Sequence, residues 1–96
     1  MTTATRHPFK VSWVFTEEES SAIHRMELVP AQDGTDAYDT IISFRSSPEK
    51  VYRYAVEDDA TAQRWNDLLS DPSARSMTSW GYEVNHARAH GDIVEM

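Results

Sequence analysis

The stretch 51–59 constrains the fold of this 96-residue chain most, because a strand pattern ends in it and an acidic helix start follows. Tyr52 and Tyr54 stand two residues apart, so on a strand both rings lie on the same face of the sheet. The acidic run 57–59 comes next, and carboxylates stabilise the positive N-terminus of a helix. The chain is therefore predicted to combine a sheet with a helix, and the tyrosine pair to form either a core wall or a stacking surface.

Alternation of apolar and polar residues predicts that most of the chain before residue 57 is β-strand. The predicted strands are 9–15, 23–29, 38–45 and 51–56. The first two are joined by the polar turn 17–21, so we expect them to form an antiparallel hairpin. Residues 30–37, which include Asp33-Gly34, are predicted to be a loop.

A helical stripe follows the fourth strand. Its apolar residues recur at i, i+4, i+7 and i+8, which places them on one face of a helix: Thr61, Trp65, Leu68 and Leu69. Asp58 or Asp59 is a suitable N-cap, and Pro72 is expected to end the helix. The predicted fold class is α+β, a four- or five-stranded antiparallel sheet with one helix packed on one face.

The predicted core combines this stripe with the aromatic residues of the first strand. Trp65 is the largest apolar group of the helix and is expected to reach the sheet. Phe9, Trp13 and Phe15 of the first strand are predicted to be core residues, and His24, Met26 and Leu28 of the second strand are predicted to share one face.

The C-terminal third has a less regular pattern. Segment 77–84 alternates again, which predicts a fifth strand or an extended packing segment with Trp80 and Tyr82 on one face. Residues 86–96 are predicted to be a partly ordered tail. No stretch has the composition of a linker, so residues 1–96 are expected to form a single domain.

Composition limits the function classes. Sixteen acidic and nine basic residues give a net charge of -7, which repels nucleic-acid phosphate and favours a basic protein partner unless a local patch reverses the sign. The chain has no cysteine for a disulfide or a thiolate metal site. No apolar run approaches the roughly 20 residues of a membrane helix, and residues 1–6 lack the apolar region of a signal peptide. We therefore expect a cytoplasmic protein that does not associate with membranes.

No motif predicts catalysis, a metal or a cofactor. His86 and His90 stand four residues apart and could begin a metal site with Asp92, but no His-Glu-x-x-His pattern accompanies them, so exposed histidines are the favoured interpretation. The serines and threonines have no base at a fixed spacing, and the three glycines are too far apart for a phosphate-binding loop. The chain is predicted not to be an enzyme and to bind no cofactor.

The order of features in residues 38–85 resembles the KTSC domain, a short domain found at the C-terminus of some lysyl-tRNA synthetases and in single-domain bacterial or phage proteins. The matching features are Ile42-Ser-Phe44-Arg45, then Tyr52-Arg53-Tyr54, then Trp65 with Leu68-Leu69, and finally Asp71-Pro-Ser73-Ala. The resemblance implies a small α+β fold in which Tyr52 and Tyr54 are the hallmark pair, with RNA binding only suggested. The hairpin 8–29 lies outside it.

Two binding functions and one catalytic function stay open. The leading prediction is a noncatalytic protein-interaction or inhibitory accessory protein of phage or bacterial origin, whose acidic surface imitates nucleic acid in a basic cleft of its partner. The alternative is a module for RNA or single-stranded nucleic acid, with the tyrosine pair supported by the cations Arg45, Lys50, Arg53 and Arg75. The third is an enzyme of unknown type that uses the C-terminal histidines. The candidate binding residues are Tyr52, Arg53, Tyr54, Trp80 and Tyr82.

Overall fold

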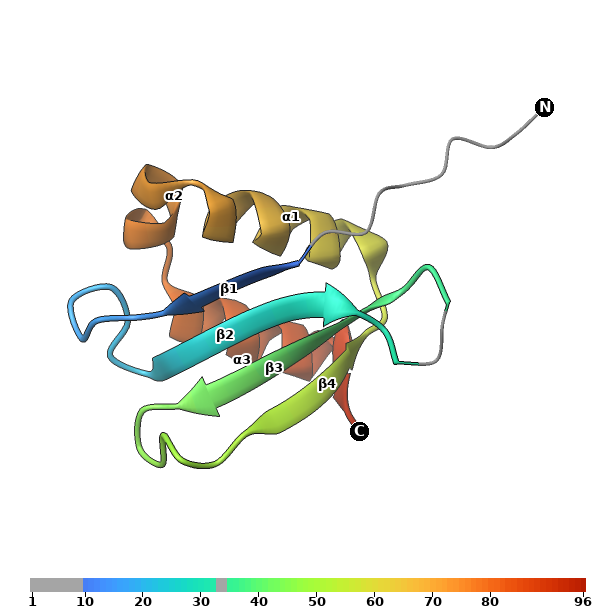
Figure 1. Cartoon of the computed structure of the whole chain (residues 1–96), viewed down its shortest axis with the longest axis horizontal. Helices are drawn as coiled ribbons and strands as arrows, with labels where there is room; N and C mark the ends of the chain where they lie inside the picture. Colours follow the sequence, from blue (N-terminus) through green and yellow to red (C-terminus); the bar gives the residue numbers. More distant parts are fainter. Residues whose placement is uncertain (1–9, 33–34) are drawn as a thin grey trace.

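A computed structural model of the chain describes residues 10–32 and 35–96. In these residues five strands form one antiparallel sheet in the order β1-β2-β3-β4-β5, and helices pack against it (Figure 1). The elements are β1 Val11–Val14, β2 Ile23–Pro30, β3 Tyr38–Phe44, β4 Tyr52–Val56, α1 Asp59–Ser70, α2 Pro72–Met77, α3 Trp80–His90 and β5 Ile93–Glu95. The predicted α+β class is confirmed. Phe9 and Asp33-Gly34 lie outside the described residues.

The core lies between one face of the sheet and the helices. Alternate residues of β2, β3 and β4 point into it, together with one side of α1 and one side of α3. Its fully buried members include Met26, Leu28, Ile42, Trp65, Leu69, Trp80 and Val84. The predicted core roles of Phe15 and Trp65 are confirmed, whereas Trp13 is half-buried and packs against the core from its edge.

A bulge shifts the predicted faces of β2. The register between β2 and β3 slips between Ile23 and Arg25, so that His24 is the extra residue. Because of this slip Ile23 is fully buried, while His24 is only half-buried. Met26 and Leu28 share a face as predicted, but the place assigned to His24 is wrong.

Helix α1 forms where the apolar stripe predicted it. Ala62, Trp65 and Leu69 are buried, and Leu68 is half-buried beside them. Asp58 is the N-cap, and its carboxylate accepts a hydrogen bond from the Thr61 hydroxyl at 2.9 Å. The helix ends before Pro72 as predicted.

The same proline starts a second helix that the sequence analysis did not anticipate. Pro72 occupies the first turn of α2, where its missing N–H costs nothing. Asp71 is the N-cap, and its carboxylate accepts from the backbone N–H groups of Ser73 and Ala74 at 3.0 and 3.4 Å. The prediction of a single helix is therefore wrong.

The strand or extended segment predicted for 77–84 is also wrong. Residues from Trp80 onward form α3, whose buried side holds Trp80, Val84 and Ala87 at helical spacing. Since Trp80 and Val84 are four residues apart, they satisfy both a period of two and a helical period. Tyr82 consequently lies on the opposite side of the helix from Trp80 and is 64% exposed, rather than sharing its face.

The tail predicted for 86–96 is ordered instead. Helix α3 continues to His90 and ends at Gly91, which has a left-handed φ of 75°. The backbone N–H of Gly91 donates to carbonyl groups of the last helical turn. The next backbone N–H, that of Asp92, donates to Ala87 O at 2.9 Å. This turn aims β5 back along β4, so the fifth strand is 93–95 rather than 77–84. Among the described helices, none has the length and apolar character needed to cross a membrane.

Candidate binding surface

The tyrosine pair lies on the sheet face that the helices cover. Tyr54 is 3% exposed and belongs to the core, whereas Tyr52 is half-buried with its ring edge-on to Phe44, 5.8 Å between centroids. Burial raises the pKa of the Tyr54 phenol above its ordinary value. Tyr54 is thus the more buried of the two. Its ring face is therefore not available for stacking.

Three of the four cations expected near the tyrosine pair, Arg45, Arg53 and Arg75, are engaged within the protein, whereas Lys50 is exposed. Arg53 extends to the other sheet face, where its Nε donates to the Asp39 carboxylate at 2.8 Å. Arg45 donates to three backbone carbonyls around the β1–β2 loop, those of Phe15, Ser20 and Ile23. These guanidinium groups hold the sheet and its loop together.

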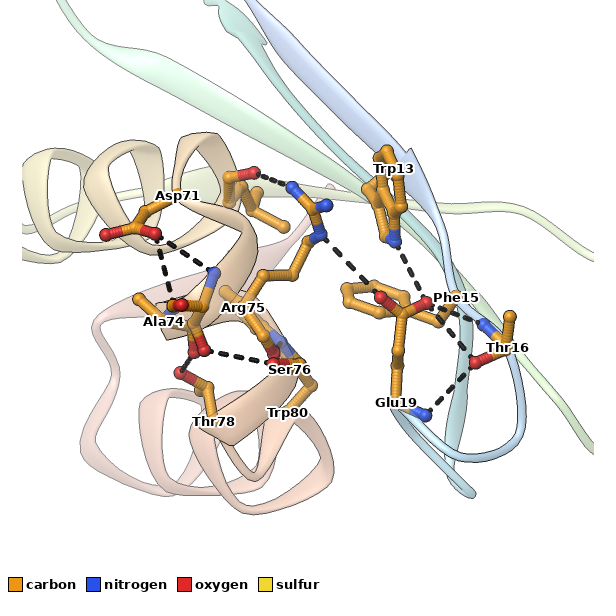
Figure 2. A network of polar contacts seen from close by, with 12 residues as sticks. Trp13, Phe15, Thr16, Glu19, Asp71, Ala74, Arg75, Ser76, Thr78 and Trp80 are labelled. Atoms are coloured by element: carbon orange, nitrogen blue, oxygen red, sulfur yellow. Dashed lines mark hydrogen bonds and ion pairs between the residues drawn. The ribbon is translucent and has the colours of Figure 1, made fainter.

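Arg75 of α2 is the centre of a buried polar network (Figure 2). Its side chain is nearly buried, and the guanidinium carbon lies 3.5 Å from the centroid of the Trp13 ring. Nη1 donates to Leu69 O at 2.7 Å, at the end of α1. The Trp80 indole donates to Arg75 O at 3.0 Å. The Arg75 side chain thus joins the edge strand β1 to the end of α1, and the Arg75 backbone carbonyl joins α2 to α3.

Glu19 completes this network from the β1–β2 loop. One carboxylate oxygen accepts from the Thr16 backbone N–H at 3.0 Å and from the Trp13 indole at 3.2 Å (Figure 2). The other lies 3.8 Å from Arg75 Nε. The Thr16 N–H, with a smaller contribution from the Trp13 indole, holds the pKa of Glu19 below its ordinary value. The carboxylate is thus kept charged beside a buried cation.

A groove runs between α1 and α3 on the outside of the molecule. It encloses about 320 Å³ and is lined by Thr61, Arg64, Trp65, Tyr82, Glu83, His86, Ala87 and Asp92. We call it the α1–α3 groove. Hydrogen bonds between the two helices form its floor. The Glu83 carboxylate accepts from Arg64 Nε at 3.1 Å, from Arg64 Nη2 at 2.9 Å and from the Trp65 indole at 3.1 Å. Arg64 is the main cause that lowers the pKa of Glu83.

Three aromatic rings follow one another along the exposed side of α3. Tyr82 stacks on His86 with 5.5 Å between ring centroids, and His86 lies 4.1 Å from His90. His86 and His90 therefore lie on the same face of α3, where both are exposed. In the described part of the chain no three metal-ligating side chains are grouped so that they could hold an ion.

The start of α1 and the segment after α3 meet at one end of the α1–α3 groove. Asp92 lines it, and the Asp92 carbonyl accepts from the Glu57 backbone N–H at 2.7 Å. Thr61, also in the lining, donates its hydroxyl to Asp58. The acidic run 57–59 therefore meets Asp92, which is more than thirty residues away in the sequence.

Sequence reasoning missed this groove because it treated 77–84 as extended and 86–96 as a tail. The helical spacing of Trp80, Val84 and Ala87 was the signal that could have found it. That spacing puts Tyr82 and His86 together on the opposite, exposed face.

Comparisons of the chain with protein-family models, with curated proteins and with solved structures found no match. The likeness of residues 38–85 to the KTSC domain therefore stays a prediction that rests on those residues alone.

Proposed function

We propose that the protein is a noncatalytic protein-interaction module that binds a basic partner through its acidic surface. The observation that carries this proposal is that three arginines form ion pairs with carboxylates of the same chain. Arg25, Arg53 and Arg64 each lie 2.8–2.9 Å from a carboxylate oxygen of the same chain. Each of these pairs is locally neutral, so in the rest of the chain thirteen carboxylates face six basic side chains.

Those carboxylates are at the surface. The β1–β2 loop exposes Glu17 and Glu18, and the start of α1 exposes the run 57–59. At physiological salt such charges act over about 8 Å, which is enough to select and orient a partner of opposite sign at contact. A partner whose basic surface ordinarily faces phosphate fits this charge, and a cytoplasmic location is part of the proposal.

Burial of Tyr54 and the pairing of Arg53 favour a protein partner over single-stranded RNA. Stacking on bases needs an exposed ring face, and phosphate binding needs cations that are not already paired. Tyr54 is in the core and Arg53 is bonded to Asp39. Neither requirement is met by this pair.

Affinity capture from a nuclease-treated host extract, with the captured proteins identified, tests the proposal. We expect basic proteins that are released by raised salt. Capture should fall strongly when both acidic runs are neutralised by Glu17→Gln, Glu18→Gln, Glu57→Gln and Asp58→Asn. A double variant of exposed neutral residues, Ser21→Ala with Gln63→Ala, is the control and should capture as the wild type does. Capture that depends on intact RNA would instead establish the nucleic-acid alternative.

A further inference from the structure

The α1–α3 groove has an exposed aromatic wall. Tyr82 is 64% exposed although it is a large ring, and its stacking on His86 holds the side chain in place along the groove. A cation that lies within about 6 Å of such a ring is attracted by the negative face of the π-system. The wall is thus suited to the guanidinium or ammonium head of a partner side chain.

The charge of the groove has the matching sign. Arg64 is the one arginine in the lining, and both of its bonding nitrogens are held by Glu83. The Arg64 charge is therefore offset within the groove wall. Asp92 remains in the lining, and the Asp58 carboxylate is bonded to the hydroxyl of Thr61, another lining residue, so negative charge exceeds positive charge there.

The groove is also formed before any partner arrives. The bonds from Arg64 and from the Trp65 indole to Glu83 fix α1 against α3. A volume of about 320 Å³ is at the lower end of the range for ligand sites, which suits one side-chain head rather than a whole ligand. A preformed site of this size loses little entropy on binding.

We propose that the α1–α3 groove binds an arginine or lysine side chain in a basic segment of the partner protein. The side chain lies along the Tyr82 ring, and its charged head meets Asp92 and the neighbouring carboxylates. This site rests on the proposed function and names the surface that performs it.

The experiment is a titration of the ¹⁵N-labelled full chain with a short, acetylated and amidated peptide of Arg-Gly repeats, followed by amide chemical shifts. The control ligand has citrulline in place of arginine, which keeps the shape and removes the charge. We expect the largest shifts at residues 58–65 and 82–92 with the arginine peptide, and none with the citrulline peptide.

Single substitutions then distinguish binding in the groove from attraction by the overall charge of the protein. Asp92→Asn and Tyr82→Ala should each weaken binding about two- to fivefold, the range for one exposed cation contact. Tyr82→Phe should bind as the wild type does, because the ring and not the hydroxyl makes the contact. Glu17→Gln removes the same single charge as Asp92→Asn at a distant loop and should leave the affinity unchanged.

Three results would overturn this site. The first is equal weakening by Asp92→Asn and Glu17→Gln, which would indicate attraction without a defined site. The second is a set of shifts centred on residues outside the two helices. The third is no binding of the arginine peptide. In each case the capture experiment decides separately whether the proposed function stands, because it does not depend on where the partner binds.

Discussion

At the scale of the residue, Arg75 explains how a small acidic protein retains a buried cation. The guanidinium has been removed from water, and that cost is offset by three kinds of partner: the Leu69 carbonyl, the Trp13 ring and the Glu19 carboxylate. Removing any cation from such a site leaves its partners unsatisfied. Arg75 should accordingly matter for stability although it does not line the α1–α3 groove.

Arg75→Ala should lower the free energy of unfolding by about 2–3 kcal/mol, because it removes a buried charged hydrogen bond and a close cation–ring contact. Arg75→Lys keeps the charge but not the planar group, so it should recover only part of the loss. Urea unfolding measures both, with the exposed Lys50→Ala as control. A loss below about half a kcal/mol for Arg75→Ala would contradict the role given to the network.

Glu83 gives a prediction that depends on pH. Its pKa in the folded protein is lowered from 4.5, mainly by Arg64, so the stability it contributes is present above pH 4.5 and is lost as the carboxylate becomes protonated below it. The difference in unfolding free energy between the wild type and Glu83→Gln should therefore be largest near neutral pH and shrink as the pH falls below 4.5. Urea melts across that range measure it. A difference that stays constant would show that the Arg64–Glu83 pair contributes no net stability.

At the scale of the element, α1 and α3 each bury one face in the core. The buried face of α1 can be recognised from the sequence, whereas that of α3 is ambiguous. In α1 the stripe is unambiguous, because Trp65, Leu68 and Leu69 cannot share one face of a strand. In α3 the residues Trp80 and Val84 fit either period. The pattern alone therefore does not separate helix from strand there.

The stripe of α1 can be tested at two adjacent leucines. Leu69 is fully buried and Leu68 only half-buried, so Leu69→Ala should cost about 2–5 kcal/mol and Leu68→Ala clearly less. Chemical unfolding of the two variants measures the difference. If Leu68→Ala were the more costly change, the helix would be rotated relative to the sheet from the arrangement described here.

At Gly81, α3 lies close to the β1–β2 loop. A Cβ at this position would lie 2.9 Å from the Ala22 Cβ, closer than two such atoms can come. Gly81→Ala should therefore destabilise the protein by about 1–3 kcal/mol, although alanine is the better helix former. Adding Ala22→Gly removes the opposing methyl group and should recover most of the loss. Thermal melts of the single and double variants decide this, and an additive loss in the double variant would exclude a steric cause.

At the scale of the whole molecule, the fold class and four strands could be predicted, because β1 to β4 follow the chain and each is recognisable from its own alternation. The C-terminal part could not. β5 is short, and it is a strand only because Gly91 turns the chain back beside β4. The α1–α3 groove depends on that same turn, since Asp92 follows Gly91. The placement of Tyr52 and Tyr54 on one face was predictable, whereas their burial depends on the helices above them.

The charge of the molecule predicts its behaviour toward DNA. The net charge of -7 and the pairing of Arg53 and Arg64 oppose the approach of phosphate, so we expect no measurable affinity for duplex DNA at physiological salt. Fluorescence anisotropy of a labelled duplex measures this, with a basic DNA-binding protein as the positive control. A specific complex of low micromolar affinity would remove the acidic-surface proposal.

The late arrival of β5 has a consequence for synthesis on the ribosome. β1 to β4 neighbour one another in chain order, so each can pair soon after it emerges. The outer edge of β4 must wait for residues 93–95, which follow only after the three helices. During that interval the nascent chain carries an unpaired row of backbone donors and acceptors, the feature by which chains add to one another as strands. The pairing of β5 therefore covers this edge of β4, and it can form only after the three helices have been synthesised.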